Sequence, residues 1–278
     1  MQFLKPLPYC PVSTLVPLFF ILVFALTWSS WLAANSLPAL KLPLLYLGIF
    51  APAFVAIALT AWREKTDGVV ALLRRLFEAN VSARWYFFAF GYMAAIKLTA
   101  AVIHRAVLGT WPRFGGEPWF VMIAATILSV VAGGQTGEEL GWRGYALPRL
   151  AARFGFAGTS IILGVIWAVW HLPLFFFLGG DTVGQSFPLY LLQVTAISVA
   201  LTWLYVHTNG SLLLTMLMHA AINNTKDIVP SRVPGASDPW ALSTSPVAWL
   251  TAALLWLFAL VFLVRLKLYT PYKDLAIA

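Results

Sequence analysis

Eight long apolar runs alternate with short polar segments along this 278-residue chain. A helix needs about 20 mostly apolar residues to cross the hydrocarbon core of a bilayer, and a helix satisfies all its backbone groups within one segment. The runs therefore predict an all-α fold, a polytopic transmembrane bundle of about eight spans, or seven if the short run 210–228 is re-entrant. The predicted spans are 14–34, 43–62, 85–107, 118–140, 157–178, 187–207, 210–228 and 246–266.

The composition agrees with a membrane protein, since 61% of the residues are hydrophobic and only 10% are charged, against about 25% charged in soluble domains. The single cysteine, Cys10, excludes an intramolecular disulfide and a cysteine metal cluster. The net charge of +8 comes from Lys and Arg residues between apolar runs, so we expect the lipid bilayer as partner and no nucleic acid. The first run exceeds the roughly 7 to 15 apolar residues of a secretory signal, and we interpret it as a span.

Lys and Arg are distributed unequally over the two sides of this predicted bundle. With a cytoplasmic N-terminus, twelve of them lie inside and five outside, as the positive-inside rule requires. We therefore predict that both termini are cytoplasmic. No internal repeat or long linker divides the chain, which indicates one integral membrane domain, 1–278. The segment 68–82 alternates apolar and basic positions at helical spacing and is typical of a helix lying along the cytoplasmic interface, or of a surface loop helix.

Two adjacent carboxylates, Glu138 and Glu139, interrupt the end of the fourth apolar run, whereas the other eight acidic residues fall in predicted loops, tails or span ends. An ionised side chain at the bilayer centre costs about 2.5 to 3.5 kcal/mol on insertion scales, so such residues usually mark a functional site. The alternative is that both are solvated at an aqueous helix end. Two of only four histidines, His171 and His219, also lie inside apolar runs.

Each of three predicted helices carries polar or aromatic side chains one turn apart, on one face. The pairs are Glu139 with Arg143, Trp167 with His171, and His219 with Asn223. Polar faces in lipid are expected to converge on one another or on water. Convergence would bring together carboxylates, two imidazoles and an amide.

Such a set suits hydrolysis by either of two chemistries. A carboxylate can take a proton from water while a histidine holds that water, and Asn with a second His can donate hydrogen bonds to an oxyanion. Alternatively, two His and one carboxylate can bind Zn²⁺ with a position open for water. The spacing leaves both open. The sequence contains no HExxH helix, which excludes zincins, and no GxSxG elbow, which excludes α/β-hydrolases. The stretch "NGSL" at 209–212 indicates a helix start capped by Asn209 or Ser211.

The words "EELGWRGYALPRL", "WHLPLF" and "GSLLLTMLMHAAINN", over about 127–227, resemble the CPBP family, the CAAX proteases and bacteriocin-processing enzymes also called Abi, which includes the type II CAAX prenyl endopeptidases. The resemblance implies an intramembrane metalloendopeptidase in a prokaryotic cell membrane. It implies that Glu138 is the base or metal-facing carboxylate and that His171 is its partner on the water. The remaining implied roles are a metal or oxyanion site completed by His219 and Asn223, and a structural pair, Glu139 and Arg143.

The resemblance also implies a Zn²⁺ site formed by His171, His219 and Glu138. Trp167, a supporting residue, stands where the second element of the family commonly has Phe, so an aromatic ring is kept. The expected substrate is a membrane-associated peptide or protein, of CAAX type or bacteriocin-like. Two other functions stay open: a non-catalytic binding or immunity protein on the same scaffold, and a transporter or proton relay, which the lack of an inverted repeat disfavours. The sequence carries no signal for oligomeric state.

Overall fold

The computed structural model describes residues 15–132, 134–176, 182, 185–233 and 238–269, and this part of the chain contains helices and no strand. The α-helices are α1 (Leu15–Ser36), α2 (Lys41–Arg74), α3 (Ala83–Leu108), α4 (Trp119–Ala132), α5 (Gln135–Glu139), α6 (Leu147–Trp170), α7 (Phe187–His207), α8 (Leu212–Ile228) and α9 (Pro246–Leu266). Shorter elements are the 3-10 helices η1 (Pro38–Leu40), η2 (Arg75–Phe77) and η4 (Leu172–Phe175), and the π-helix η3 (Leu140–Ala146).

The predicted polytopic helical class is confirmed. Six helical stretches of the described chain are long and apolar enough to cross a membrane, fewer than the eight spans expected. Helices also form in the two other predicted runs, but α4 has 14 residues and α8 has 17. They fall short of the roughly 20 residues of a full span.

The predicted boundary between the fourth and fifth spans is wrong. The fourth run ends as a helix at Ala132, because Gly134 has the left-handed backbone angle φ 95°. The segment 141–156, expected as a loop, is almost entirely helical: α5, η3 and α6 form one helical stretch, Gln135–Trp170, which turns a corner at Gly155 (φ 66°). The seven residues of η3 are all buried, so the part of the segment that carries Arg143 lies within the bundle and not in water.

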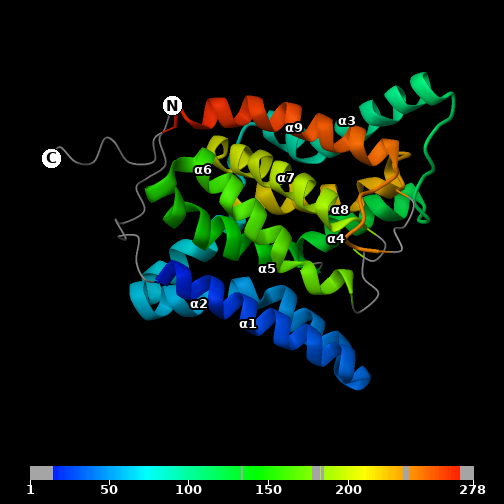
Figure 1. Cartoon of the computed structure of the whole chain (residues 1–278). Coiled ribbons are helices and arrows are strands. Elements are labelled where there is room, and N and C mark those ends of the chain that lie inside the picture. The colour runs from blue at the N-terminus through cyan, green and yellow to red at the C-terminus, as the bar shows by residue number, and fades with distance from the viewer. Residues whose placement is uncertain (1–14, 133, 177–181, 183–184, 234–237, 270–278) are drawn as a thin grey trace.

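The helices pack in successive layers across the bundle (Figure 1). Helix α1 lies along α2 at one edge, and α3 and α9 pack together at the opposite edge. Between these edges α6 packs along α7, and α8 contacts both α3 and α4. The short helix α5 lies between α2 and α8, and the two glutamates therefore enter the interior of the bundle.

Arg75, Arg84 and Arg265 lie at the end of the bundle where α7 ends and α8 begins, here called the basic end. Helix α2 turns sharply at Lys65 (φ 56°), and the helical part that follows covers the first half of the predicted interfacial segment 68–82. Just beyond it, Arg75 donates hydrogen bonds to the Gly210 and Gly144 carbonyls and to the Tyr205 hydroxyl. The basic end is the side that the charge distribution predicts to be cytoplasmic. Both terminal segments, 1–14 and 270–278, lie outside the described residues, so their cytoplasmic location stays a prediction.

Candidate active site

Helix α5 and the π-helix η3 lie against α2 through glycines. A Cβ on Gly137 would lie 3.0 Å from Cα of Phe50, and one on Gly141 would lie 2.4 Å from Cβ of Pro52. Glycines spaced three or four residues apart share a helix face, and small residues let membrane helices approach closely. With this face on α2, Glu138 and Glu139 are directed to α6 and α8, where they find their partners.

Glu139 is the centre of a buried ion-pair network. Its Oε1 accepts a hydrogen bond from Nη1 of Arg143 at 2.9 Å and lies 3.0 Å from Nδ1 of His219 on α8. The side chains of Glu139 and Arg143 are completely buried, at 0% exposure. Since a buried charge needs a partner, this carboxylate neutralises Arg143 and fixes α8 against α5. The contact between Glu139 and Arg143 is the one that their i, i+4 spacing predicted.

Glu138 faces the other helix, α6. Its Oε2 accepts a hydrogen bond from the indole Nε1 of Trp167 at 2.7 Å and lies 4.0 Å from Nε2 of His171. The side chains of Glu138 and His171 retain 10% and 13% of their exposure. The two adjacent glutamates therefore differ in environment: Glu139 is completely buried, and Glu138 is buried but keeps a small exposed fraction.

His171 follows the last residue of α6. The helix ends there because Pro173 disfavours helical backbone in the residue before it and breaks the hydrogen-bond ladder. Nδ1 of His171 lies 2.9 Å from the Trp167 carbonyl oxygen, which only accepts, so Nδ1 carries the hydrogen. In the neutral ring Nε2 therefore holds a lone pair, and it is Nε2 that faces Glu138.

Trp167 contacts four residues of the site: Glu138, Arg143, His171 and His219. Besides its hydrogen bond to Glu138, its ring lies 4.5 Å from Cζ of Arg143, a cation-π contact. The centroids of the His219 and His171 rings lie 5.1 Å and 5.9 Å from its own centroid. Trp167 thus holds the side chains of three helical elements at fixed distances, a larger role than the sequence had indicated for an aromatic ring at this position.

Helix α8 begins as predicted, because the Ser211 side chain caps it and accepts a hydrogen bond from the backbone N–H of Leu214. His219, two turns further on, is buried with 3% exposure. Asn223, one turn after His219, has an exposed side chain. An accessible amide suits a group that meets substrate.

The described residues do not fit the expected zinc site. No group of three or more His, Cys, Asp and Glu side chains in the described part of the chain is arranged to hold a metal ion. Nδ1 of His219 is engaged by Glu139, and Oε2 of Glu138 accepts from Trp167. The ligand set His171, His219 and Glu138 is therefore not assembled around one point in this arrangement.

The support of the site by α1 was not predicted from the sequence. Trp170, next to His171, donates its indole N–H to Thr27 at 2.9 Å, and Trp28 donates to the Trp170 carbonyl at 3.0 Å. The Thr27 hydroxyl in turn donates to the Gly48 carbonyl of α2 at 3.0 Å. These bonds fix the end of α6 against α1 and α2. The polar positions in the first apolar run were the signal available in the sequence.

Comparison with known proteins bears on the same region. Residues 115–225 match the family model described as "Type II CAAX prenyl endopeptidase Rce1-like". The chain is also similar to a Methanococcus maripaludis protein named "CAAX prenyl protease 2", at 23% identity over 76% of this chain and 84% of that relative. The matched range includes every residue of the three motifs. The similarity to type II CAAX prenyl endopeptidases that the motifs indicated is therefore confirmed.

Proposed function

We propose that this chain, as a relative of the type II CAAX prenyl endopeptidases, is an intramembrane endopeptidase that hydrolyses a peptide bond of a membrane-associated protein. The observation that supports this most directly is the pair Glu138 and His171. Their reactive atoms face each other at 4.0 Å, and both side chains keep a small exposed fraction. The neighbouring charged pair, Glu139 and Arg143, is fully buried and has no access to a substrate.

The distance between Glu138 and His171 suits a shared water molecule. At 4.0 Å the two atoms are too far apart for a direct hydrogen bond, and a separation beyond about 3.5 Å is one that a single water can bridge. Oε2 of Glu138 accepts one hydrogen of the attacking water, and Nε2 of His171 accepts the other. The oxygen lone pair is then directed toward the carbonyl carbon of the substrate.

In the reaction, the water oxygen bonds to the carbonyl carbon as Glu138 takes its proton, giving a tetrahedral intermediate with an oxyanion. Glu138 then returns this proton to the amide nitrogen, and the carbon–nitrogen bond breaks to release an amine and a carboxylic acid. In general acid–base catalysis, the same carboxylate can act first as the base and then as the acid. The exposed amide of Asn223 donates a hydrogen bond to the oxyanion.

The other residues of the set hold this pair in place. Trp167 fixes the rotamer of Glu138 through its indole N–H, and its carbonyl fixes the tautomer of His171. Arg143 and His219 hold Glu139, the sequence neighbour of Glu138. Because the described residues do not fit a metal ion, no step of this mechanism passes through zinc.

We base the proposed substrate class on the names of the relatives and on the membrane setting. The matched family and the archaeal relative both carry names that refer to prenylated CAAX proteins, so a membrane-associated protein of this type is the first candidate, and a bacteriocin-like precursor is the second. The six membrane-crossing stretches make the chain a multi-pass membrane protein. We assign it to the plasma membrane of a prokaryotic cell.

The test uses the full chain reconstituted in liposomes, with three membrane-bound peptides as substrates: a farnesylated CAAX peptide, the same peptide with a palmitoyl anchor, and a bacteriocin-type precursor. Mass spectrometry of the products gives the initial rate and the cleaved bond. Glu138→Gln keeps an oxygen to accept from Trp167 but removes the base, so the rate should fall by about 100-fold or more. Glu78→Gln, an exposed carboxylate at the basic end, is the matched control.

The outcome separates the three functions considered. Cleavage that requires Glu138 and not Glu78 supports the endopeptidase, and the preferred peptide identifies the substrate class. Equal cleavage by wild type and Glu138→Gln would show that Glu138 is not the base. Tight binding of a peptide that is never cleaved, or flux of a solute across the liposome, would favour the binding protein or the transporter.

A further inference from the structure

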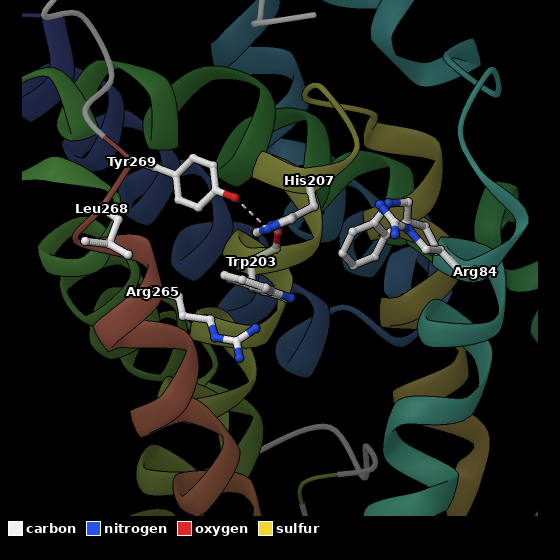
Figure 2. Close-up of a pocket in the computed structure, with 7 residues that line it drawn as sticks. Arg84, Trp203, His207, Arg265, Leu268 and Tyr269 are labelled. Carbon is white, nitrogen blue, oxygen red and sulfur yellow. Dashed lines mark hydrogen bonds between the residues drawn. The ribbon is translucent and has the colours of Figure 1, made fainter. Parts of the chain in front are cut away.

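A cavity of about 430 Å³ opens at the basic end, where the ends of α3, α7 and α9 meet (Figure 2). Figure 2 shows Trp203 and His207 of α7 between α9 on one side and α3 on the other. Of the seven described residues that line it, two are arginines, four have aromatic or imidazole rings, and none carries a carboxylate. They are Arg84, Trp85, Trp203, His207, Arg265, Leu268 and Tyr269.

His207 forms a fixed wall of this cavity. Its Nδ1 lies 2.8 Å from the Trp203 carbonyl oxygen, and its Nε2 lies 2.9 Å from the Tyr269 hydroxyl. A carbonyl oxygen only accepts, so Nδ1 carries the hydrogen, and Nε2 of the neutral ring accepts from Tyr269. Both ring nitrogens are thus used within the protein, and the arginines are the groups left to meet a ligand.

The two arginines approach from different helices and lie over aromatic rings. Cζ of Arg84 is 5.2 Å from the Trp85 ring centroid, and Cζ of Arg265 is 6.0 Å from that of Trp203. A guanidinium that lies over a ring still has N–H donors along its edge, in the fork that matches phosphate oxygens. Both side chains are exposed, so these donors are available to a ligand that enters the cavity.

The surface beside the cavity is apolar. Phe258 and Val261 are exposed at 44% and 46%, and their spacing places them on the same face of α9 as Arg265. Leu268, exposed at 81%, follows just after the end of α9 and lines the cavity. An uncovered apolar strip that ends in a basic, aromatic cavity matches the outline of a phospholipid, with acyl chains along the helix and the headgroup at the bilayer surface. Basic sites between the ends of membrane helices are known to select anionic headgroups.

We infer that this cavity binds an anionic phosphate group, held by Arg84 and Arg265 and walled by Trp203 and His207. The strip on α9 favours a phospholipid headgroup over free phosphate as its source. This site is separate from the Glu138 and His171 pair and does not depend on the proposed peptidase activity.

In the test, the purified full chain in detergent is titrated with dioctanoyl phosphatidylglycerol, with its phosphatidylcholine analogue and with inorganic phosphate. Calorimetry gives the Kd of each ligand. The double variant Arg84→Gln, Arg265→Gln should weaken binding of phosphatidylglycerol about tenfold or more, since it removes charge-assisted hydrogen bonds. The matched control is Arg63→Gln, Lys267→Gln. It removes the same charge from exposed side chains outside the cavity lining and should change the Kd by less than about twofold.

Binding of phosphatidylglycerol that depends on the two arginines, with weak binding of phosphatidylcholine and phosphate, supports a lipid site. Arginine-dependent binding of inorganic phosphate with equal affinity also supports the anion site and identifies free phosphate as the source. Equal affinity of wild type and the double variant for phosphatidylglycerol overturns the inference, as does equal affinity for phosphatidylcholine. The single variants Arg84→Gln and Arg265→Gln provide the same comparison if the double variant does not fold.

Discussion

Trp167 donates its indole N–H to Oε2 of Glu138 across 2.7 Å, and this bond joins α6 to α5. The side chain of the adjacent Glu139 is directed to α8 instead. The same indole lies against the rings of both site histidines. Its carbonyl oxygen accepts from Nδ1 of His171. One residue therefore orients both groups to which we assign the attacking water.

Replacing Trp167 with Phe tests this orienting role. The variant keeps an aromatic ring, but it leaves Glu138 without its indole donor. A hydrogen bond to a charged group contributes about 1.5 to 3 kcal/mol, and we expect kcat to fall about tenfold with little change in KM, because the substrate does not bind through the indole. Peptide cleavage in liposomes measures both constants.

The control for this variant is Trp62→Phe, which changes an indole with 69% exposure. It should leave kcat within about twofold of wild type, since surface substitutions have small effects. A fall in kcat that is the same in both variants, or a rise in KM alone for Trp167→Phe, would contradict the orienting role.

The buried pair Glu139 and Arg143 should matter for stability. Glu139→Gln leaves the charge of Arg143 buried at 0% exposure and uncompensated, and breaking such a pair typically costs about 3 to 5 kcal/mol. The double variant Glu139→Gln, Arg143→Met removes both charges and should be more stable than the single variant. Thermal unfolding in detergent, followed by circular dichroism, gives the comparison.

A more accessible pair serves as the control. Glu64 and Arg149 form an ion pair at 2.5 Å, with side-chain exposures of 27% and 14%. Surface ion pairs contribute about 0 to 1 kcal/mol, so Glu64→Gln should lower the unfolding temperature much less than Glu139→Gln. Equal effects of the two variants would show that burial of the Glu139 pair has no special consequence.

Spacing along single helices allowed the sequence to predict part of the site. The pair Glu139 and Arg143 could be predicted because residues four apart on one helix are neighbours whatever the rest of the fold does. The contact between Glu139 and His219 could not, because it joins α5 to α8. Which helices pack together depends on side-chain shapes across the whole bundle, and local spacing does not encode it.

The helix boundaries near the site were missed for a related reason. The apolar run 118–140 looks continuous, and its break depends on the left-handed backbone of Gly134. The polar stretch after Glu139 looked like a loop in water because it contains Arg143. In the structure Glu139 neutralises Arg143 inside the bundle, so the arginine does not require water and the stretch stays helical.

Removing metal ions distinguishes the two chemistries that the sequence left open. Because the described His and carboxylate groups are not arranged around one point, we expect cleavage by the purified chain to be unchanged after treatment with 1,10-phenanthroline. Elemental analysis should find less than about 0.1 zinc per chain, against the single ion that a catalytic site holds. Stoichiometric zinc that is lost in His219→Ala, together with inhibition by the chelator, would establish the metal mechanism instead.

The close contact between η3 and α2 should be sensitive to a single methyl group. A Cβ on Gly141 would lie 2.4 Å from Cβ of Pro52 and 2.7 Å from its carbonyl carbon. Since backbone cannot rotate away as a flexible side chain can, Gly141→Ala must separate the two helices, and overpacking of this kind typically costs about 1 to 3 kcal/mol. The separation would also displace Glu138, three residues earlier, so activity should fall together with the unfolding temperature.

Gly91→Ala is the matched substitution, because a Cβ there meets nothing within 4 Å and Gly91 lies in the interior of α3. Replacing glycine by alanine in a helix removes an entropic penalty of about 0.5 to 1 kcal/mol, so this variant should unfold at the wild-type temperature or slightly above it. The same change in residue type would then have opposite effects at two positions. If Gly141→Ala were as stable as Gly91→Ala, η3 and α2 would not be in the close contact described here. The explanation of why the glutamates are directed to α6 and α8 would then fail.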